Sequence, residues 1–174
     1  MKKAVILLIA LITSMTITAQ VKAKAPVVDP KEQINKTLDA WHKDAAETNF
    51  KNYFDAMTDD SVFIGTDATE HWDKTAFQAF AKPYFDKGKA WNFTSLERHI
   101  YLSSDKKLAW FDELLNTQMK ICRGSGVLVL ANGNWKIKQY VLSMTVPNDN
   151  TDQVIEVKAP IEDELILTLQ EKKN

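Results

Sequence analysis

The stretch Ile121–Val146, ICRGSGVLVLANGNWKIKQYVLSMTV, decides the fold class of this 174-residue chain. Apolar and polar residues alternate on both sides of Asn132-Gly133, and Asn-Gly is the strongest short signal for a β-hairpin turn. A two-residue turn pairs Ala131 with Asn134 and thereby fixes the register of both strands. The sequence therefore predicts an antiparallel hairpin with strands over Ile121–Leu130 and Trp135–Val146.

Outward from this hairpin, the hydrophobic period changes along the chain. Trp91–Leu102 and Lys107–Asn116 also alternate with a period of two and extend the meander to four strands. Earlier segments repeat with helical spacing: Ile34 to Ala45, Phe50 to Met57 and Phe77 to Tyr84, with a short strand over Ser61–Gly65. Helices followed by an antiparallel meander indicate an α+β domain over residues 31–149, with helices on one sheet face. Residues 150–174 form a tail that is predicted to be partly helical.

Composition limits the partners of the protein. The chain is 45% hydrophobic and 26% charged, with a formal net charge of −1. A nucleic-acid or anionic-membrane partner would favour a basic surface, so neither is expected. The single cysteine, Cys122, cannot form an intramolecular disulfide, and packing alone must therefore stabilise the fold.

The first residues have the features of an export signal. Lys2 and Lys3 precede an apolar run over Ala4–Ile12, and Ile17-Thr18-Ala19 is an acceptable cleavage site. The run is shorter than the roughly 20 residues that span a bilayer, so a stable membrane anchor is not expected. The sequence predicts a signal peptide over residues 1–19, a flexible lead-in over residues 20–30, and a periplasmic or secreted protein.

The predicted hairpin register places two glycines opposite longer residues. Gly124 falls opposite Val141 and Gly126 opposite Gln139. A glycine in a strand marks either a bend of the sheet or a close approach by another group, so both sheet curvature and a ligand cavity beside Gln139 are open. The other face exposes an apolar patch that needs a cover, either the tail or a second subunit, and we expect a homodimer through it: Tyr140, Leu142 and Met144.

The preceding hairpin brings charges together across two strands. With Asp105 and Lys106 as its loop, Arg98 lies opposite Glu113 and His99 opposite Asp112, on opposite faces. Both pairs could be structural, because a lone charge among apolar neighbours is costly. The pair that faces the helices could instead line a pocket and act as acid or base. We expect His99 and Asp112 to be that catalytic pair, with Tyr101 and Trp110 as ligand-binding walls.

Three further residues are candidate ligand contacts. His42 lies at the edge of the first helix's buried stripe, where a hydrogen-bonded core histidine is the alternative reading. Glu70 and Trp72 follow a turn and could close the mouth of the pocket. The sequence has no metal-ligand spacing, phosphate-binding loop, dinucleotide fingerprint or nucleophile elbow, and so predicts neither a metal nor a cofactor.

Six stretches together resemble the SnoaL-like branch of the nuclear-transport-factor-2-like superfamily. They are Leu38–Lys43 (LDAWHK), Val62–Ala68 (VFIGTDA), Arg98–Tyr101 (RHIY), Ala109–Glu113 (AWFDE), Arg123–Leu128 (RGSGVL) and Trp135–Tyr140 (WKIKQY). The resemblance implies a curved antiparallel sheet wrapped on three helices into a cone, usually dimeric, with an internal pocket. It also implies cofactor-free enzymes that use an aspartate or a histidine–aspartate pair, or binding and assembly modules with no chemistry.

Two hypotheses follow. The first is an exported protein that binds a small organic molecule in its cone and acts on it as an isomerase, cyclase or dehydratase. The second is a non-catalytic dimeric module that recognises a protein partner.

Overall fold

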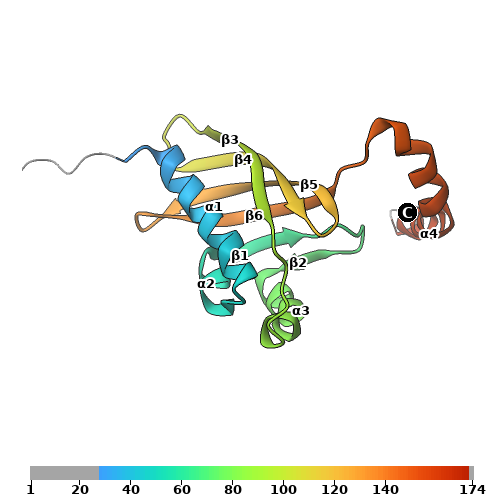
Figure 1. Ribbon diagram of the computed structural model, residues 1–174, viewed down its shortest axis with the longest axis horizontal. Helices are drawn as coiled ribbons and strands as arrows, with labels where there is room; N and C mark the ends of the chain where they lie inside the picture. Colours follow the sequence, from blue (N-terminus) through green and yellow to red (C-terminus); the bar gives the residue numbers. More distant parts are fainter. Residues whose placement is uncertain (1–27, 173–174) are drawn as a thin grey trace, which may run out of the picture.

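The computed structural model describes residues 28–172, and within them one curved, open sheet of six strands packs against helices (Figure 1). This confirms the predicted α+β class. The predicted signal peptide and residues 20–27 of the lead-in lie outside the described residues. None of the helices in the described part of the chain is both long enough and apolar enough to cross a membrane.

Three helices precede the meander, as the sequence predicts: α1 (Pro30–Ala46), α2 (Phe50–Asp55) and α3 (Lys74–Asp86). The side chain of Asp29 accepts a hydrogen bond from the Lys31 amide at 3.0 Å and caps α1. Asp73 caps α3 in the same way, accepting from the Ala76 amide at 2.8 Å. These caps satisfy amides that have no partner within a helix and therefore fix where each helix begins.

The strands are β1 (Met57–Ile64), β2 (His71–Asp73), β3 (Thr94–Leu102), β4 (Leu108–Thr117), β5 (Lys120–Ala131) and β6 (Asn134–Met144). Their order is β2-β1-β6-β5-β4-β3, with β1 parallel to β6 and the other neighbours antiparallel. Asn132 and Gly133 have φ of 50° and 80°, and Ala131 pairs with Asn134. The predicted two-residue turn is therefore confirmed, because this type of turn needs positive φ at both central residues.

The predicted register of the β5–β6 hairpin holds only for its first half. Leu128 pairs with Ile137, but Val127 pairs with Gln139, so Lys138 is an extra residue that forms a bulge in β6. The Lys138 amine forms an ion pair with Asp60 of β1. Because a bulge adds one residue to a period of two, every later side chain of β6 changes face.

The bulge overturns the predicted apolar patch. Tyr140 and Leu142 point into the core, at 0% and 6% exposure, and Met144 alone of the three is exposed. The predicted dimer surface through these residues is therefore wrong. Gln139, expected on the inner face, lies on the outer face and is exposed.

Aromatic and aliphatic side chains form the core on the concave side of the sheet. Trp41 of α1 stacks on Tyr53 of α2 at 4.8 Å between ring centroids and meets Tyr140 of β6 edge-on at 4.8 Å. Phe63 of β1 stacks on Phe77 of α3 at 3.9 Å. These contacts join all three helices to the sheet, and a hollow lies between β1, β2 and α3.

The C-terminal tail is a single helix, α4 (Thr151–Glu171), preceded by a short turn over Asn148–Asn150. It is more helical than the Ile161–Gln170 segment that the sequence indicates. Figure 1 shows α4 standing away from the sheet and the other helices, and none of its residues is buried.

Candidate ligand site

A cavity of about 170 Å³ lies at one end of the cone, between β1, β2, α3 and the β4–β5 turn. Half of its twelve lining residues are aromatic: Phe63, Trp72, Phe77, Phe80, Trp91 and Phe93, with Gly65, Thr66, Glu70, Gln118, Met119 and Leu142 completing the wall. Trp72 stacks on Phe80 at 4.5 Å, and Phe77 stacks on Trp91 at 5.8 Å. The cavity therefore offers rigid apolar walls to a small molecule.

Glu70 is the one ionisable residue in this lining. Its backbone closes the turn between β1 and β2, because the Gly65 amide donates to its carbonyl at 3.0 Å. Its side-chain Oε2 accepts from the Asp67 amide at 3.2 Å. A Cβ at Gly65 would lie 2.1 Å from this oxygen, so the carboxylate can fold over the strand end only because residue 65 is glycine.

Of the eight residues predicted from the sequence, the cavity brings two together, Glu70 and Trp72. Five others lie on the outer face of the sheet and are at least partly exposed: His99, Tyr101, Trp110, Asp112 and Gln139. The expectation that His99 and Asp112 face the helices is wrong, although their predicted pairing across β3 and β4 is confirmed. The His99 Nδ1 lies 3.3 Å from Asp112 Oδ1, and the two side chains are 50% and 41% exposed.

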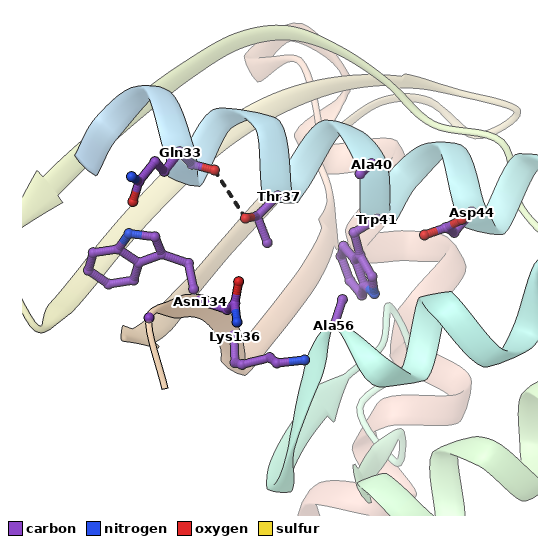
Figure 2. A pocket seen from close by; sticks show the side chains of 10 residues that line it. Gln33, Thr37, Ala40, Trp41, Asp44, Ala56, Asn134 and Lys136 are labelled. Atoms are coloured by element: carbon purple, nitrogen blue, oxygen red, sulfur yellow. Dashed lines mark hydrogen bonds between the residues drawn. The ribbon is translucent and has the colours of Figure 1, made fainter. Parts of the chain in front are cut away.

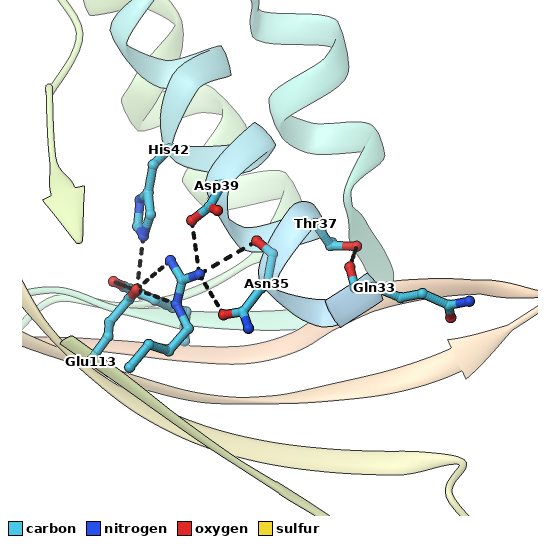
Figure 3. Close-up of polar contacts among 8 residues, drawn as sticks. Gln33, Asn35, Thr37, Asp39, His42 and Glu113 are labelled. Carbon is cyan, nitrogen blue, oxygen red and sulfur yellow. Dashed lines mark hydrogen bonds and ion pairs between the residues drawn. The ribbon is translucent and has the colours of Figure 1, made fainter. Parts of the chain in front are cut away.

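The pair that faces inward is Arg98 and Glu113, and it anchors a buried polar network with α1 (Figure 3). The Glu113 Oε2 accepts from Arg98 Nε at 2.9 Å, and Oε1 lies 2.8 Å from His42 Nε2 and accepts from the Tyr140 hydroxyl at 3.1 Å. On its other side, Arg98 Nη1 donates to Asn35 Oδ1 at 3.0 Å and to Asp39 Oδ1 at 2.8 Å. His42 is thus a hydrogen-bonded core histidine.

Glu113 is charged inside the core because its neighbours compensate for burial. Burial alone would raise its pKa, but the hydrogen bond and charge of His42 and the charge of Arg98 outweigh it and hold the pKa below its ordinary value. Burial and the Glu113 charge raise the pKa of the Tyr140 hydroxyl, which stays a donor. The network therefore satisfies a buried ion pair with oriented partners.

Gly124 of β5 leaves room for this network, and Gly126 leaves room for the backbone of β6 and for Phe111. A Cβ at Gly124 would lie 2.2 Å from the Tyr140 hydroxyl and 3.0 Å from Glu113 Oε1. A Cβ at Gly126 would lie 2.3 Å from the Gln139 carbonyl oxygen and 2.9 Å from Phe111. The sequence left open whether these glycines mark a bend of the sheet or a ligand cavity. The space beside both glycines is occupied by groups of the protein itself, so it is not a ligand cavity.

The network does not reach the cavity. Phe63 and Phe93 line the cavity, and their rings lie 5.6 Å from the Tyr140 ring and 6.2 Å from the His42 ring, respectively. None of Arg98, Glu113, His42 or Tyr140 belongs to the cavity wall. A ligand in the cavity would contact these aromatic rings and not the charged groups behind them.

A larger groove of about 430 Å³ lies between α1 and the β5–β6 turn (Figure 2). Gln33, Thr37 and Asp44 of α1 face Asn134 and Lys136 of β6 across it. Trp41 and Trp135 also line the groove, but they are almost wholly buried. Because it presents polar rims and no open aromatic face, we take the smaller aromatic cavity as the candidate ligand site.

Sequence reasoning missed the aromatic residues that α3 and residues 91–93 bring to the cavity. A signal was present, because Phe77, Phe80 and Trp91 are large apolar residues near the Glu70–Trp72 turn, but which of them face a hollow depends on how α3 packs. Within residues 28–172, no group of three or more histidine, cysteine, aspartate or glutamate side chains could hold a metal ion.

Comparisons with known proteins agree with this architecture. The sequence matches the SnoaL-like domain family over residues 34–147, which is most of the chain, and it matches no curated protein. An NTF2-like protein of unknown function from Pseudomonas putida KT2440 has a TM-score of 0.58 at 12% identity, covering 68% of this chain and 89% of its own.

Two further solved structures carry functional descriptions. A candidate calcium/calmodulin-dependent kinase II association domain from Exiguobacterium sibiricum has a TM-score of 0.57 at 18% identity, covering 72% of this chain and 100% of its own. A candidate scytalone dehydratase from Novosphingobium aromaticivorans has a TM-score of 0.56 at 10% identity, covering 67% of this chain and 84% of its own. At such identities the likeness shows the fold alone. The family match over residues 34–147 shows that the chain belongs to the SnoaL-like domain family, and its fold resembles that of the NTF2-like neighbour.

Proposed function

We propose that the protein binds a small, partly apolar organic molecule in the aromatic cavity. The observation that carries this proposal is the cavity itself, about 170 Å³ with half of its lining residues aromatic. A cavity of roughly 150 Å³ in another protein holds one benzene molecule, so this one has room for a single ring or a group of similar size. Structural neighbours described as candidate dehydratases support a small-molecule role for this fold.

Glu70 would be the acid or base in any proton transfer to or from that molecule. It is the one ionisable group in the cavity wall, whereas Glu113 lies behind the aromatic rings and is held by three partners. A proton-transfer group must come within hydrogen-bond reach of its substrate. Cofactor-free isomerase or dehydratase chemistry is therefore a narrower form of the proposal that depends on Glu70.

The test is to fill the cavity and ask whether binding is lost. A panel of neutral, cationic and anionic one-ring molecules is screened by ligand-observed NMR against the wild-type protein, Met119→Trp and Met144→Trp. Met119 lines the cavity, whereas Met144 is exposed and is not among the lining residues, so it serves as the matched control. We expect binders that the first substitution abolishes and the second spares. The absence of binders, or binding that survives Met119→Trp, would overturn the proposal.

A second candidate function is assembly with another copy of the chain. Tyr101 and Trp110 stack on the outer sheet face at 5.8 Å and are each almost half exposed, and α4 exposes Val157 and Ile161. A second copy would cover both apolar surfaces, which one copy leaves open. Two neighbours described as association domains favour this candidate. Sedimentation should show a dimer that Trp110→Glu dissociates, and a monomer at all concentrations would exclude it.

We also propose that the protein is exported and that cleavage follows Ala19. The charged start, short apolar run and small residue before Gln20 support this. Intact mass of the protein recovered from periplasm or medium should equal that of residues 20–174. A full-length mass in the cytoplasmic fraction would contradict export.

A further inference from the structure

The walls of the aromatic cavity favour positive charge. The ring of an aromatic side chain has a negative face, which attracts a cation that lies within about 6 Å of its centre. Trp72, Phe77, Phe80 and Trp91 stand nearly parallel to their stacking partners, with interplanar angles of 25° or less. The rings cover part of one another's faces, and a small ligand would contact the ring faces and edges that still line the cavity.

The charged residue of the cavity wall, Glu70, also favours a cationic ligand. Glu70 Oε2 is held by the Asp67 amide, and within residues 28–172 its other oxygen, Oε1, has no hydrogen bond. None of the twelve lining residues is a lysine, arginine or histidine. Lys89 lines an adjoining hollow with Phe80 and Trp91, but it is exposed, so solvent screens its charge.

The geometry points to a small organic cation, an alkylammonium or arylalkylammonium group, as the ligand class of this cavity. This inference rests on the proposed function, because it names the ligand of the same site. Aromatic walls supply a face for the apolar groups around the nitrogen, and Glu70 supplies the counter-charge. A neutral molecule of the same shape would keep the apolar contacts and lose both electrostatic ones.

Gly65 is the positioning residue in this arrangement. A Cβ at residue 65 would lie 2.1 Å from Glu70 Oε2, so a methyl group there must push the carboxylate away. Gly65→Ala should therefore weaken binding of a cation while leaving binding of a neutral molecule nearly unchanged. Gly133, whose added Cβ would meet no atom within 4 Å, is not a matched control because its φ is positive.

The experiment compares three probes that each carry three methyl groups on one quaternary atom: choline, 3,3-dimethyl-1-butanol and 3,3-dimethylbutanoate. They present a cation, a neutral group and an anion of similar size, and all dissolve in water. Isothermal titration calorimetry with the full protein should give choline an affinity about tenfold above that of the alcohol, the usual range for a partly desolvated cation–π site. The anion should bind more weakly than the alcohol.

Variants assign the preference to the named groups. Glu70→Gln should reduce choline affinity several-fold and leave the alcohol unchanged, and Gly65→Ala should act in the same direction. Asp112→Asn, a carboxylate change on the outer face, should change neither. Equal affinities for choline and the alcohol, a choline affinity that Glu70→Gln does not alter, or no choline binding would each overturn the inference. Binding of neutral one-ring molecules would then still uphold the proposed function, so the two can fail separately.

Discussion

Two neighbouring cross-strand pairs of β3 and β4, Arg98–Glu113 and His99–Asp112, have similar chemistry and opposite surroundings. The side chains of the first pair are 6% and 0% exposed, whereas those of the second are half exposed. The inner pair is completed by His42 and Tyr140, whereas His99 is shared between Asp112 and Glu97. One step along a strand thus changes an ion pair from a surface contact into a part of the core.

The largest expected effect comes from removing the buried charge. Glu113→Gln leaves Arg98 inside the core with only the exposed Asp39 as a charged partner, and should lower the free energy of unfolding by about 3–5 kcal/mol. Asp112→Asn on the outer face should change it by no more than about 0.5 kcal/mol. Guanidinium unfolding of both variants measures the difference, and equal losses would break the comparison.

A double substitution sharpens the same point. If the cost of Glu113→Gln comes from an unpaired arginine, then Arg98→Met with Glu113→Leu should be less destabilising than the single Glu113→Gln. A double variant less stable than the single one would mean that the ion pair itself stabilises the fold.

The next largest effect on stability concerns β5, the strand that pairs with β4 beside both ion pairs. Gly124 is opposite Glu113 and Ser125 is opposite Asp112. Gly124→Ala forces a methyl group against the Tyr140 hydroxyl and should cost about 1–3 kcal/mol, whereas Ser125→Ala should be within about 0.5 kcal/mol of wild type. Tyr140→Phe should recover part of the loss, because it removes the atom at 2.2 Å but leaves ring carbon Cζ at 2.8 Å. Thermal unfolding of the three variants tests this.

Local sequence signals predicted most of the fold because strand period and turn chemistry are local properties. The Asn132-Gly133 turn and the pairing of Arg98 with Glu113 followed from residues close in sequence. The bulge at Lys138 did not follow from a regular period of two. Its trace in the sequence is two consecutive polar residues, Lys138 and Gln139, between two apolar ones that are both buried.

The candidate site was less predictable because it depends on contacts between distant segments. Both Arg98 and His99 have apolar neighbours, and the inward face is decided by Asn35 and Asp39 of α1, which meet Arg98 across 63 and 59 residues of chain. Glu70 and Trp72 could be found because a turn placed them at a strand end. The remaining cavity wall needed the position of α3.

The smallest expected effect is the pH dependence that Glu113 confers on stability. Its folded pKa lies below the ordinary 4.5, so between these two values the unfolded chain binds more protons than the folded one. The free energy of unfolding should therefore rise with pH in that window. The contribution is complete above pH 4.5 and is lost as the pH falls through the folded pKa.

Carbon-13 NMR of the Glu113 side-chain carboxyl should give a midpoint below 4.5 in the folded protein. A midpoint at or above that value would mean that burial outweighs His42 and Arg98, and that folding does not favour the charged form of Glu113.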